Sequence, residues 1–112
     1  MRVNPEERRR HPRKPVQDRA VLHRETEGAH PALYGTALDI SVSGMRLKLK
    51  QALEAGERVT VVIHLEGHPG SFRLSGKARW SAPARGDKNF LLGIELDERD
   101  EAALASWRQV FD

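Results

Sequence analysis

Three stretches of this chain alternate apolar and polar residues with a period of two. Residues 45–49 place Met, Leu and Leu at every second position, with Arg and Lys between them. Residues 59–65 repeat this alternation, and residues 72–80 place Phe, Leu, Gly, Ala and Trp on one side. Successive side chains of a β-strand point to opposite sides, so this pattern predicts strands that are buried on one side only. Half-buried strands are therefore expected to form the body of the fold.

Further strands are predicted over residues 16–24, 33–40 and 89–96, with turn residues between all six segments. Many short strands joined by turns are typical of a closed antiparallel barrel or a small sandwich. We predict a mainly β fold, a six-stranded antiparallel β-barrel, because closure removes exposed strand edges.

The two ends of the chain differ from these strands. Residues 1–15 contain three prolines among charged side chains, which predicts a flexible basic N-terminal arm. Residues 16–112 are predicted to form the barrel domain. Within it, residues from about 97 to 111 carry apolar side chains at helical spacing after an acidic first turn, which predicts a C-terminal α-helix. Its Trp107 is expected to pack against the barrel.

Length and composition exclude several classes of function. A chain of 112 residues has room for one domain, and the lack of cysteine excludes disulfides and thiolate metal sites. The five histidines do not stand at metal-ligand spacing, and the chain carries no recognisable catalytic motif, so we expect no enzyme, metal or cofactor. The chain has neither a long apolar run nor a start that resembles a signal peptide, so the expected location is the cytoplasm.

Positive charge is concentrated at the N-terminus. The first 24 residues carry eight Lys/Arg and three Asp/Glu, a balance of +5, whereas the whole chain has a net charge of +3, which leaves −2 for the rest. A protein that binds nucleic acid along its backbone more often spreads its positive charge over a folded face. Concentrated charge favours a small anion as the ligand, and leaves open a basic arm that contacts nucleic acid.

A polar segment, residues 39–44, follows directly on a predicted strand. If the backbone stays extended, Leu38 lies on the buried side, and Asp39 and Ser41 lie together on the other. A carboxylate accepts N–H donors, a hydroxyl both donates and accepts, and Gly44 lets a ligand approach the backbone. The alternative interpretation of the same residues is an ordinary turn.

An arginine cluster in the arm complements this segment. It consists of Arg8, Arg9, Arg10 and Arg13. A guanidinium can bind a phosphate with two N–H groups, bind guanine O6 and N7 in the same way, or stack on a purine. The two clusters together predict a site for an anionic purine nucleotide, although an arginine-rich terminus can also be a solvated or nucleic-acid-binding arm.

The order and spacing of these residues resemble the PilZ domain, a bacterial receptor module for cyclic di-GMP, whose signature is RxxxR followed by (D/N)xSxxG. The likeness extends over about residues 6–112, through a strand that ends in Trp80 and a strand centred on Gly93. Leu96 departs from the pattern, since many members carry Phe there, and this concerns packing. The matching motif residues are Arg9, Arg13, Asp39, Ser41 and Gly44.

This resemblance implies a PilZ-like barrel that binds cyclic di-GMP and signals to a downstream protein, in control of motility, biofilm or exopolysaccharide. It implies that the arginines bind phosphate or guanine, that Asp39 accepts from guanine N–H groups and that Ser41 adds a hydroxyl. It implies further that ligand binding orders the arm. In this family an arginine such as Arg8, just before the motif, accompanies binding of an intercalated ligand dimer.

Trp80 and one basic strand face each allow two interpretations. Trp80 either closes the end of the barrel or stacks on a purine at its rim. Arg46, Lys48 and Lys50 form a basic strand face, which we interpret as a solvated surface; the alternative is a second contact for phosphate or an acidic partner.

The sequence leaves two alternative functions open. A small basic barrel could bind single-stranded nucleic acid through its arm and this strand face, but most of the few aromatic residues are predicted to face the core, where bases cannot stack on them. The second alternative is a PilZ-like fold that acts as an adaptor without binding a ligand. The intact motifs argue against this alternative.

Overall fold

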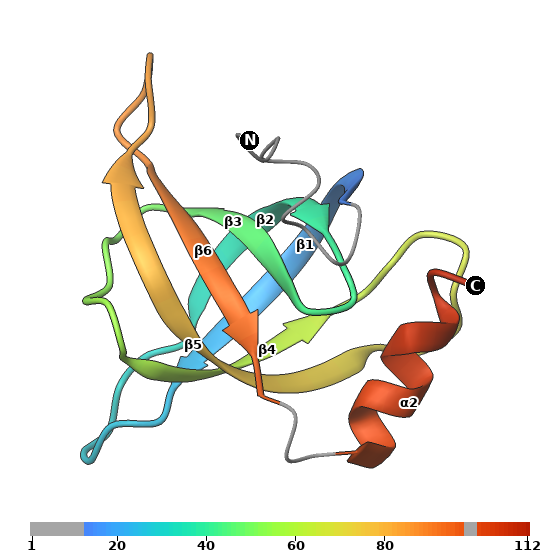
Figure 1. The fold of residues 1–112 in the computed structure, drawn as a ribbon. Coiled ribbons are helices and arrows are strands. Elements are labelled where there is room, and N and C mark those ends of the chain that lie inside the picture. The colour runs from blue at the N-terminus through green and yellow to red at the C-terminus, as the bar shows by residue number, and fades with distance from the viewer. Residues whose placement is uncertain (1–12, 98–100) are drawn as a thin grey trace, which may run out of the picture.

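The computed structural model describes residues 13–97 and 101–112. Arg8, Arg9 and Arg10 lie outside the described residues, and so does the predicted flexibility of the arm before residue 13. The six predicted strands and the C-terminal helix are confirmed, with small shifts at their ends (Figure 1). Their bounds are β1 (Lys14–Arg24), β2 (Leu33–Ile40), β3 (Gly44–Leu49), β4 (Arg58–Ile63), β5 (Phe72–Pro83), β6 (Phe90–Leu96) and α2 (Glu101–Gln109).

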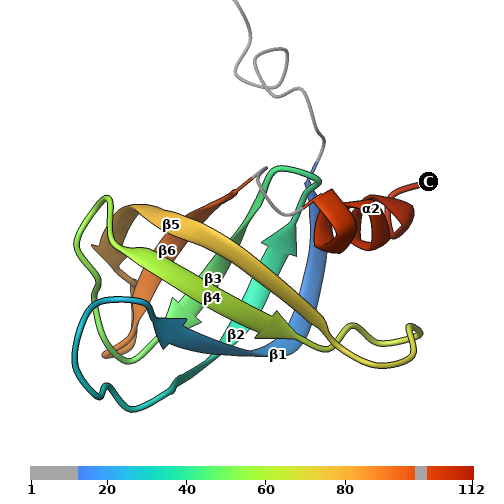
Figure 2. The ribbon, with the colours of Figure 1, turned by 90° about the horizontal axis from the view of Figure 1, so that it is seen from below.

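The strands form a closed barrel in the order β1-β2-β3-β6-β5-β4, and β4 returns to pair with β1. Every neighbouring pair is antiparallel. Figures 1 and 2 show the strands curling around a single interior, with the β5–β6 connection extending beyond one end. The predicted antiparallel barrel is thus confirmed.

Strand β1 begins at Lys14, two residues before the predicted start of the domain. Pro15 stands inside this strand, opposite Asp39 of β2, and the pairing register shifts between Pro15 and Asp18. Proline has no N–H to donate to a strand ladder, so it is tolerated beside such an irregularity. The end of the predicted arm therefore belongs to the sheet.

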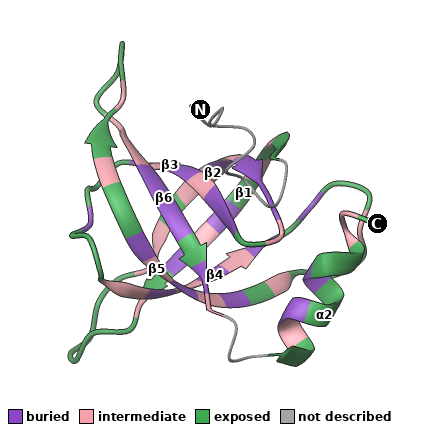
Figure 3. Cartoon of the chain, viewed as in Figure 1, coloured by how far each residue is buried: buried purple, intermediate pink, exposed green. Residues whose placement is uncertain are grey.

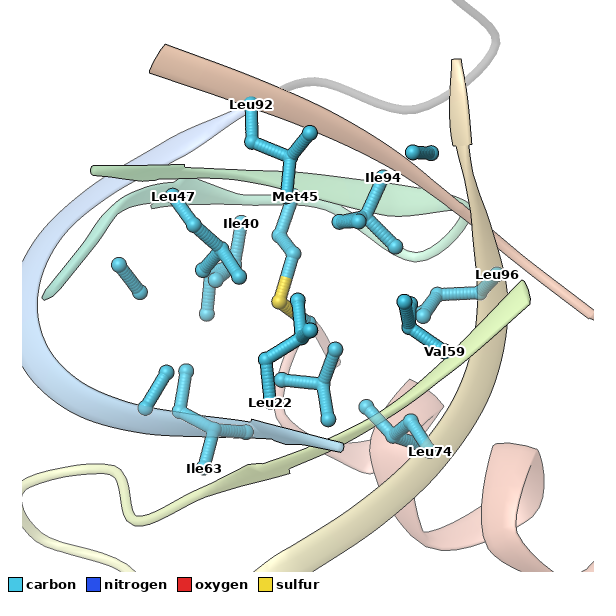
Figure 4. Packing of buried hydrophobic residues seen from close by; sticks show 14 of the residues in the cluster. Leu22, Ile40, Met45, Leu47, Val59, Ile63, Leu74, Leu92, Ile94 and Leu96 are labelled. Atoms are coloured by element: carbon cyan, nitrogen blue, oxygen red, sulfur yellow. The ribbon is translucent and has the colours of Figure 1, made fainter. Parts of the chain in front are cut away.

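Alternating apolar side chains fill the interior of the barrel. The inward residues of β3 are all buried, while Arg46 and Lys48 face outward, as the sequence pattern predicted (Figure 3). Met45 lies among leucine, isoleucine and valine side chains from the surrounding strands (Figure 4). Its flexible thioether suits the irregular space at the centre of a small barrel.

Helix α2 packs against the end of the barrel where the β2–β3 turn lies (Figure 2). Trp107 is fully buried at this contact, with its ring edge-on to Phe72 and to Phe111. Its indole Nε1 donates a hydrogen bond of 2.9 Å to the backbone oxygen of Ser41. The prediction that Trp107 packs on the barrel is confirmed. Within the described part of the chain, no helix is long and apolar enough to cross a membrane.

Candidate functional site

A β-bulge in β2 places Leu38 on the same outward side of the strand as Asp39. The pairing of β2 with β3 shifts between Ala37 and Asp39, so Leu38 is an extra residue in the strand. Asp39 then pairs with the outward-facing Arg46, and Leu38 lines the same surface hollow as Asp39. The prediction that Leu38 lies on the buried side is wrong, because a bulge interrupts the strict alternation of side chains.

A second bulge, in β5, moves Trp80 outward. The register with β6 shifts between Ala78 and Trp80, and Trp80 pairs with Gly93. Trp80 is 40% exposed, whereas Ala78 is fully buried. The prediction that both residues share the core-facing side is therefore wrong. Trp80 lies on the outer surface and does not close the barrel.

These two bulges align candidate site residues in one cross-strand row, which we call the site row. It runs from Pro15 on β1 through Asp39, Arg46 and Gly93 to Trp80 on β5, each paired with the next. The indole of Trp80 lies directly over Gly93, since a Cβ atom at Gly93 would stand 2.2 Å from its Nε1 atom. The missing side chain at Gly93 thus provides the space for the indole.

Asp39 binds two arginines at once. Its Oδ1 atom accepts a hydrogen bond of 2.6 Å from Nη1 of Arg13, and its Oδ2 atom accepts one of 2.6 Å from Nε of Arg46. Asp39 is only 7% exposed, so its charge needs such partners, and charge-assisted bonds of this kind are strong. The arginine side chains remain 31% and 39% exposed. One buried carboxylate therefore orients two guanidinium groups toward solvent, and the three side chains together carry a net charge of +1.

A hollow of about 530 Å³ opens over this cluster. Its volume lies within the range of small-molecule sites, roughly 300–1,000 Å³. Two cations, one anion and one exposed indole face can together bind an anionic group and a planar ring. Its lining residues are Arg13, Pro15, Leu38, Asp39, Arg46 and Trp80.

A second hollow of similar size, about 520 Å³, is lined by residues of β4, β5 and β6 and by Ser43 of the β2–β3 turn. It shares no described lining residue with the first. Arg58 and Asp97 form an ion pair at this place, and Lys77 and Glu95 also line it. The two positive and two negative side chains that line this hollow balance one another. It therefore has no excess positive charge to attract an anion.

The sequence as a whole matches a known family. The model of the PilZ domain matches residues 7–109. The chain belongs to the PilZ domain family. A comparison with curated protein sequences gave no match.

Several solved structures share this fold. The PilZ domain of Escherichia coli YcgR with c-di-GMP superposes with a TM-score of 0.67 at 15% identity, over 92% of this chain and 88% of that one. The complex of MrkH from K. pneumonia with c-di-GMP gives 0.74 at 16% identity, over 92% and 50%. The inhibitor of motility MotI from Bacillus subtilis gives 0.68 at 18% identity, over 93% and 52%. The chain spans about half the length of the last two proteins.

Two residues of the PilZ signature play a part in folding. Ser41 is buried, its N–H donates to the oxygen of Gly44 at 2.8 Å, and the N–H of Gly44 donates to its Oγ atom at 3.1 Å. A Cβ atom at Gly44 would stand 2.3 Å from the backbone oxygen of Ile94. The prediction that Ser41 lies on the same outward side as Asp39 is therefore wrong, because residues 41–43 form the β2–β3 turn. This turn fixes the end of β2 next to Asp39.

The structure brings together part of the predicted PilZ site. Arg13, Asp39 and Trp80 line one hollow, while Arg8, Arg9 and Arg10 remain predictions. Arg46 also lines this hollow, although we had interpreted it as a solvated residue. Its outward place on the strand after the signature was visible in the sequence, but its pairing with Asp39 depends on the bulge at Leu38. Among the described residues, no group of side chains is arranged to hold a metal ion.

The fit of Trp80 over Gly93 predicts the effect of a substitution. In Gly93→Ala, the added methyl group displaces the indole, and we expect the free energy of unfolding to fall by about 1–3 kcal/mol. Denaturant unfolding measures this loss, and the Nε1–H signal of Trp80 in an NMR spectrum reports the displacement. In a Trp80→Ala background the same change should cost almost nothing, because the ring is gone. Equal losses in both backgrounds would contradict this packing.

Proposed function

We propose that this chain is a cyclic di-GMP receptor that passes the signal to another protein and catalyses no reaction. The observation that carries this proposal is the Asp39 carboxylate between Arg13 and Arg46, beside the exposed Trp80 indole, in a hollow of about 530 Å³. Membership of the PilZ family supports the same ligand, as do the YcgR and MrkH structures named with c-di-GMP.

The ligand has two kinds of group that this site can recognise. Its phosphates need cations, which Arg13 and the arm residues Arg8, Arg9 and Arg10 supply. Its guanine rings need a flat partner, which the indole of Trp80 offers. Asp39 holds the guanidinium of Arg13 in place and accepts N–H groups of a base with its remaining lone pairs. Ser41 and Gly44 act from below, by fixing the turn that follows Asp39.

The signal is proposed to arise from the N-terminal arm. Arg13 stands directly before β1 and is bound to Asp39, so a ligand at this point lies where the arm meets the barrel. A ligand that binds the arm arginines and the site row at the same time ties the arm to the barrel surface. The changed surface would then be read by a partner protein in the cytoplasm, in control of motility or biofilm formation.

Isothermal titration of the purified protein with cyclic di-GMP tests this proposal. We expect micromolar or tighter binding by the wild type and a loss of about ten- to a hundredfold in Arg9→Ala, since a charge-assisted hydrogen bond contributes about 1.5–3 kcal/mol. Arg2→Ala, an arm arginine outside the motif, is the matched control and should bind like the wild type. GTP should bind far more weakly.

The opposite result is equally clear. If the wild type gives no heat with cyclic di-GMP but binds single-stranded DNA with an affinity that falls steeply with salt, the arm serves nucleic acid and the receptor proposal is wrong.

A further inference from the structure

Arg46 retains hydrogen-bonding groups that its contact with Asp39 does not use. The bond to Asp39 leaves from Nε, and a guanidinium carries five N–H donors in one rigid plane. Among the described residues, the two terminal nitrogens of Arg46 have no recorded partner, and the side chain is 39% exposed. The outer end of the guanidinium therefore presents two parallel donors to the hollow.

The position of Arg46 is fixed more firmly than that of Arg13. Arg46 lies inside β3 and pairs with Asp39 on one side and Gly93 on the other. Arg13 stands one residue outside β1. A donor held on a paired strand and oriented by a buried carboxylate is preorganised for a rigid partner, such as the edge of a base, more than for a flexible phosphodiester.

The neighbouring surface decides which rigid partner fits. The indole of Trp80 fills the space above Gly93, directly beside Arg46 in the site row. A purine that stacks on the outer indole face lies in the hollow with one edge toward Arg46. Guanine presents two acceptors on its Hoogsteen edge, O6 and N7, whereas adenine presents one acceptor and one donor. Two parallel N–H donors match guanine and are opposed by the adenine amino group.

We propose that Arg46 binds O6 and N7 of a guanine stacked on Trp80, and that it thereby makes the site selective for guanine. This inference rests on the proposed function and assigns a role to a residue outside the RxxxR and (D/N)xSxxG signature. Asp39 acts here as a positioning residue, because its Oδ2 atom holds the guanidinium plane through Nε.

A chemical double-mutant cycle tests this contact. Wild type and Arg46→Ala are each titrated with cyclic di-GMP and with its 7-deazaguanine analogue, which lacks the N7 acceptor. We expect Arg46→Ala to bind cyclic di-GMP at least tenfold more weakly. The wild type should lose several-fold in affinity for the analogue, and Arg46→Ala should lose nothing further, because the partner of N7 is already missing.

Two further variants separate the contact from charge and from folding. Arg46→Lys keeps the positive charge but lacks the planar pair of donors, so it should also lose the preference for N7. Lys48→Ala removes the next outward cation of β3, which is ion-paired with Asp87 and does not line the hollow, and it should behave like the wild type. Melting temperatures of all variants show whether each is folded.

The outcomes distinguish this inference from the proposed function. No binding by the wild type would overturn the proposed function. Wild-type binding together with an equal 7-deaza penalty in Arg46→Ala would overturn only the role of Arg46. Unchanged affinity of a folded Arg46→Ala for cyclic di-GMP would overturn it as well.

Discussion

Replacing Trp107 with alanine is expected to lower the free energy of unfolding by about 3–5 kcal/mol. Trp107 is the largest fully buried side chain, and its ring lies edge-on to Phe72 and Phe111. Its removal leaves a cavity between α2 and the barrel and an unpaired backbone oxygen at Ser41. Small domains have a total stability of about 5–15 kcal/mol, so this variant is close to the limit of folding. Denaturant unfolding by circular dichroism measures the loss.

Two variants separate packing from hydrogen bonding at this contact. Trp107→Phe keeps an aromatic ring but removes the N–H donor to Ser41, and we expect a loss of about 1–3 kcal/mol from the unsatisfied oxygen. Trp80→Ala removes the exposed tryptophan and should cost less than Trp107→Ala, because Trp80 is 40% exposed. A loss at Trp107 no larger than the small loss expected at an exposed tryptophan would show that α2 contributes little to the stability of the barrel.

Replacing Asp39 with alanine is expected to weaken cyclic di-GMP binding by about a hundredfold, which corresponds to about 2–3 kcal/mol. The carboxylate orients Arg13 and Arg46 through two bonds of 2.6 Å. Without it, two guanidinium groups repel each other and lose their common direction toward the hollow. Isothermal titration measures the affinity, and a melting curve establishes that the variant is folded.

Asp39→Asn is the matched control for charge. It keeps the size of the side chain and one acceptor oxygen, but it removes the negative charge, so one of the two arginines loses an acceptor. We expect an affinity between those of the wild type and Asp39→Ala. If both variants bind as tightly as the wild type, the orientation of the two arginines by Asp39 is irrelevant to the ligand.

The period-two pattern was sufficient to predict the barrel because most strand residues obey it. Met45, Leu47 and Leu49 are buried and alternate with outward-facing Arg46 and Lys48, as the sequence indicates. The same pattern could not predict the bulges at Leu38 and Arg79, where one extra residue reverses the side to which a strand points. Bulges depend on the pairing of strands far apart in the chain, which local alternation does not record.

The candidate site was predictable in composition but not in arrangement. Asp39 and Trp80 were recognised as candidate site residues from the motif and from the strand end. Asp39 lies on the outward side that alternation predicted, whereas Trp80 reaches the outer surface only through a bulge. Arg46 and Gly93 were missed as site residues because their roles arise from cross-strand neighbours. Ser41 was expected to face a ligand, and its buried hydroxyl instead closes the β2–β3 turn.

The closure of the barrel limits how a partner can bind. Many signalling proteins join their targets by main-chain pairing at a free sheet edge. Here each of β1 to β6 pairs with a neighbour on both sides over part of its length, since β4 returns to β1. Among the strands, residues 14–19 of β1 and 78–83 of β5 pair on one side only. A partner that contacts the doubly paired part of the barrel must recognise side chains. Substitutions of single surface residues, which leave the backbone ladder intact, are therefore sufficient to map where that partner binds.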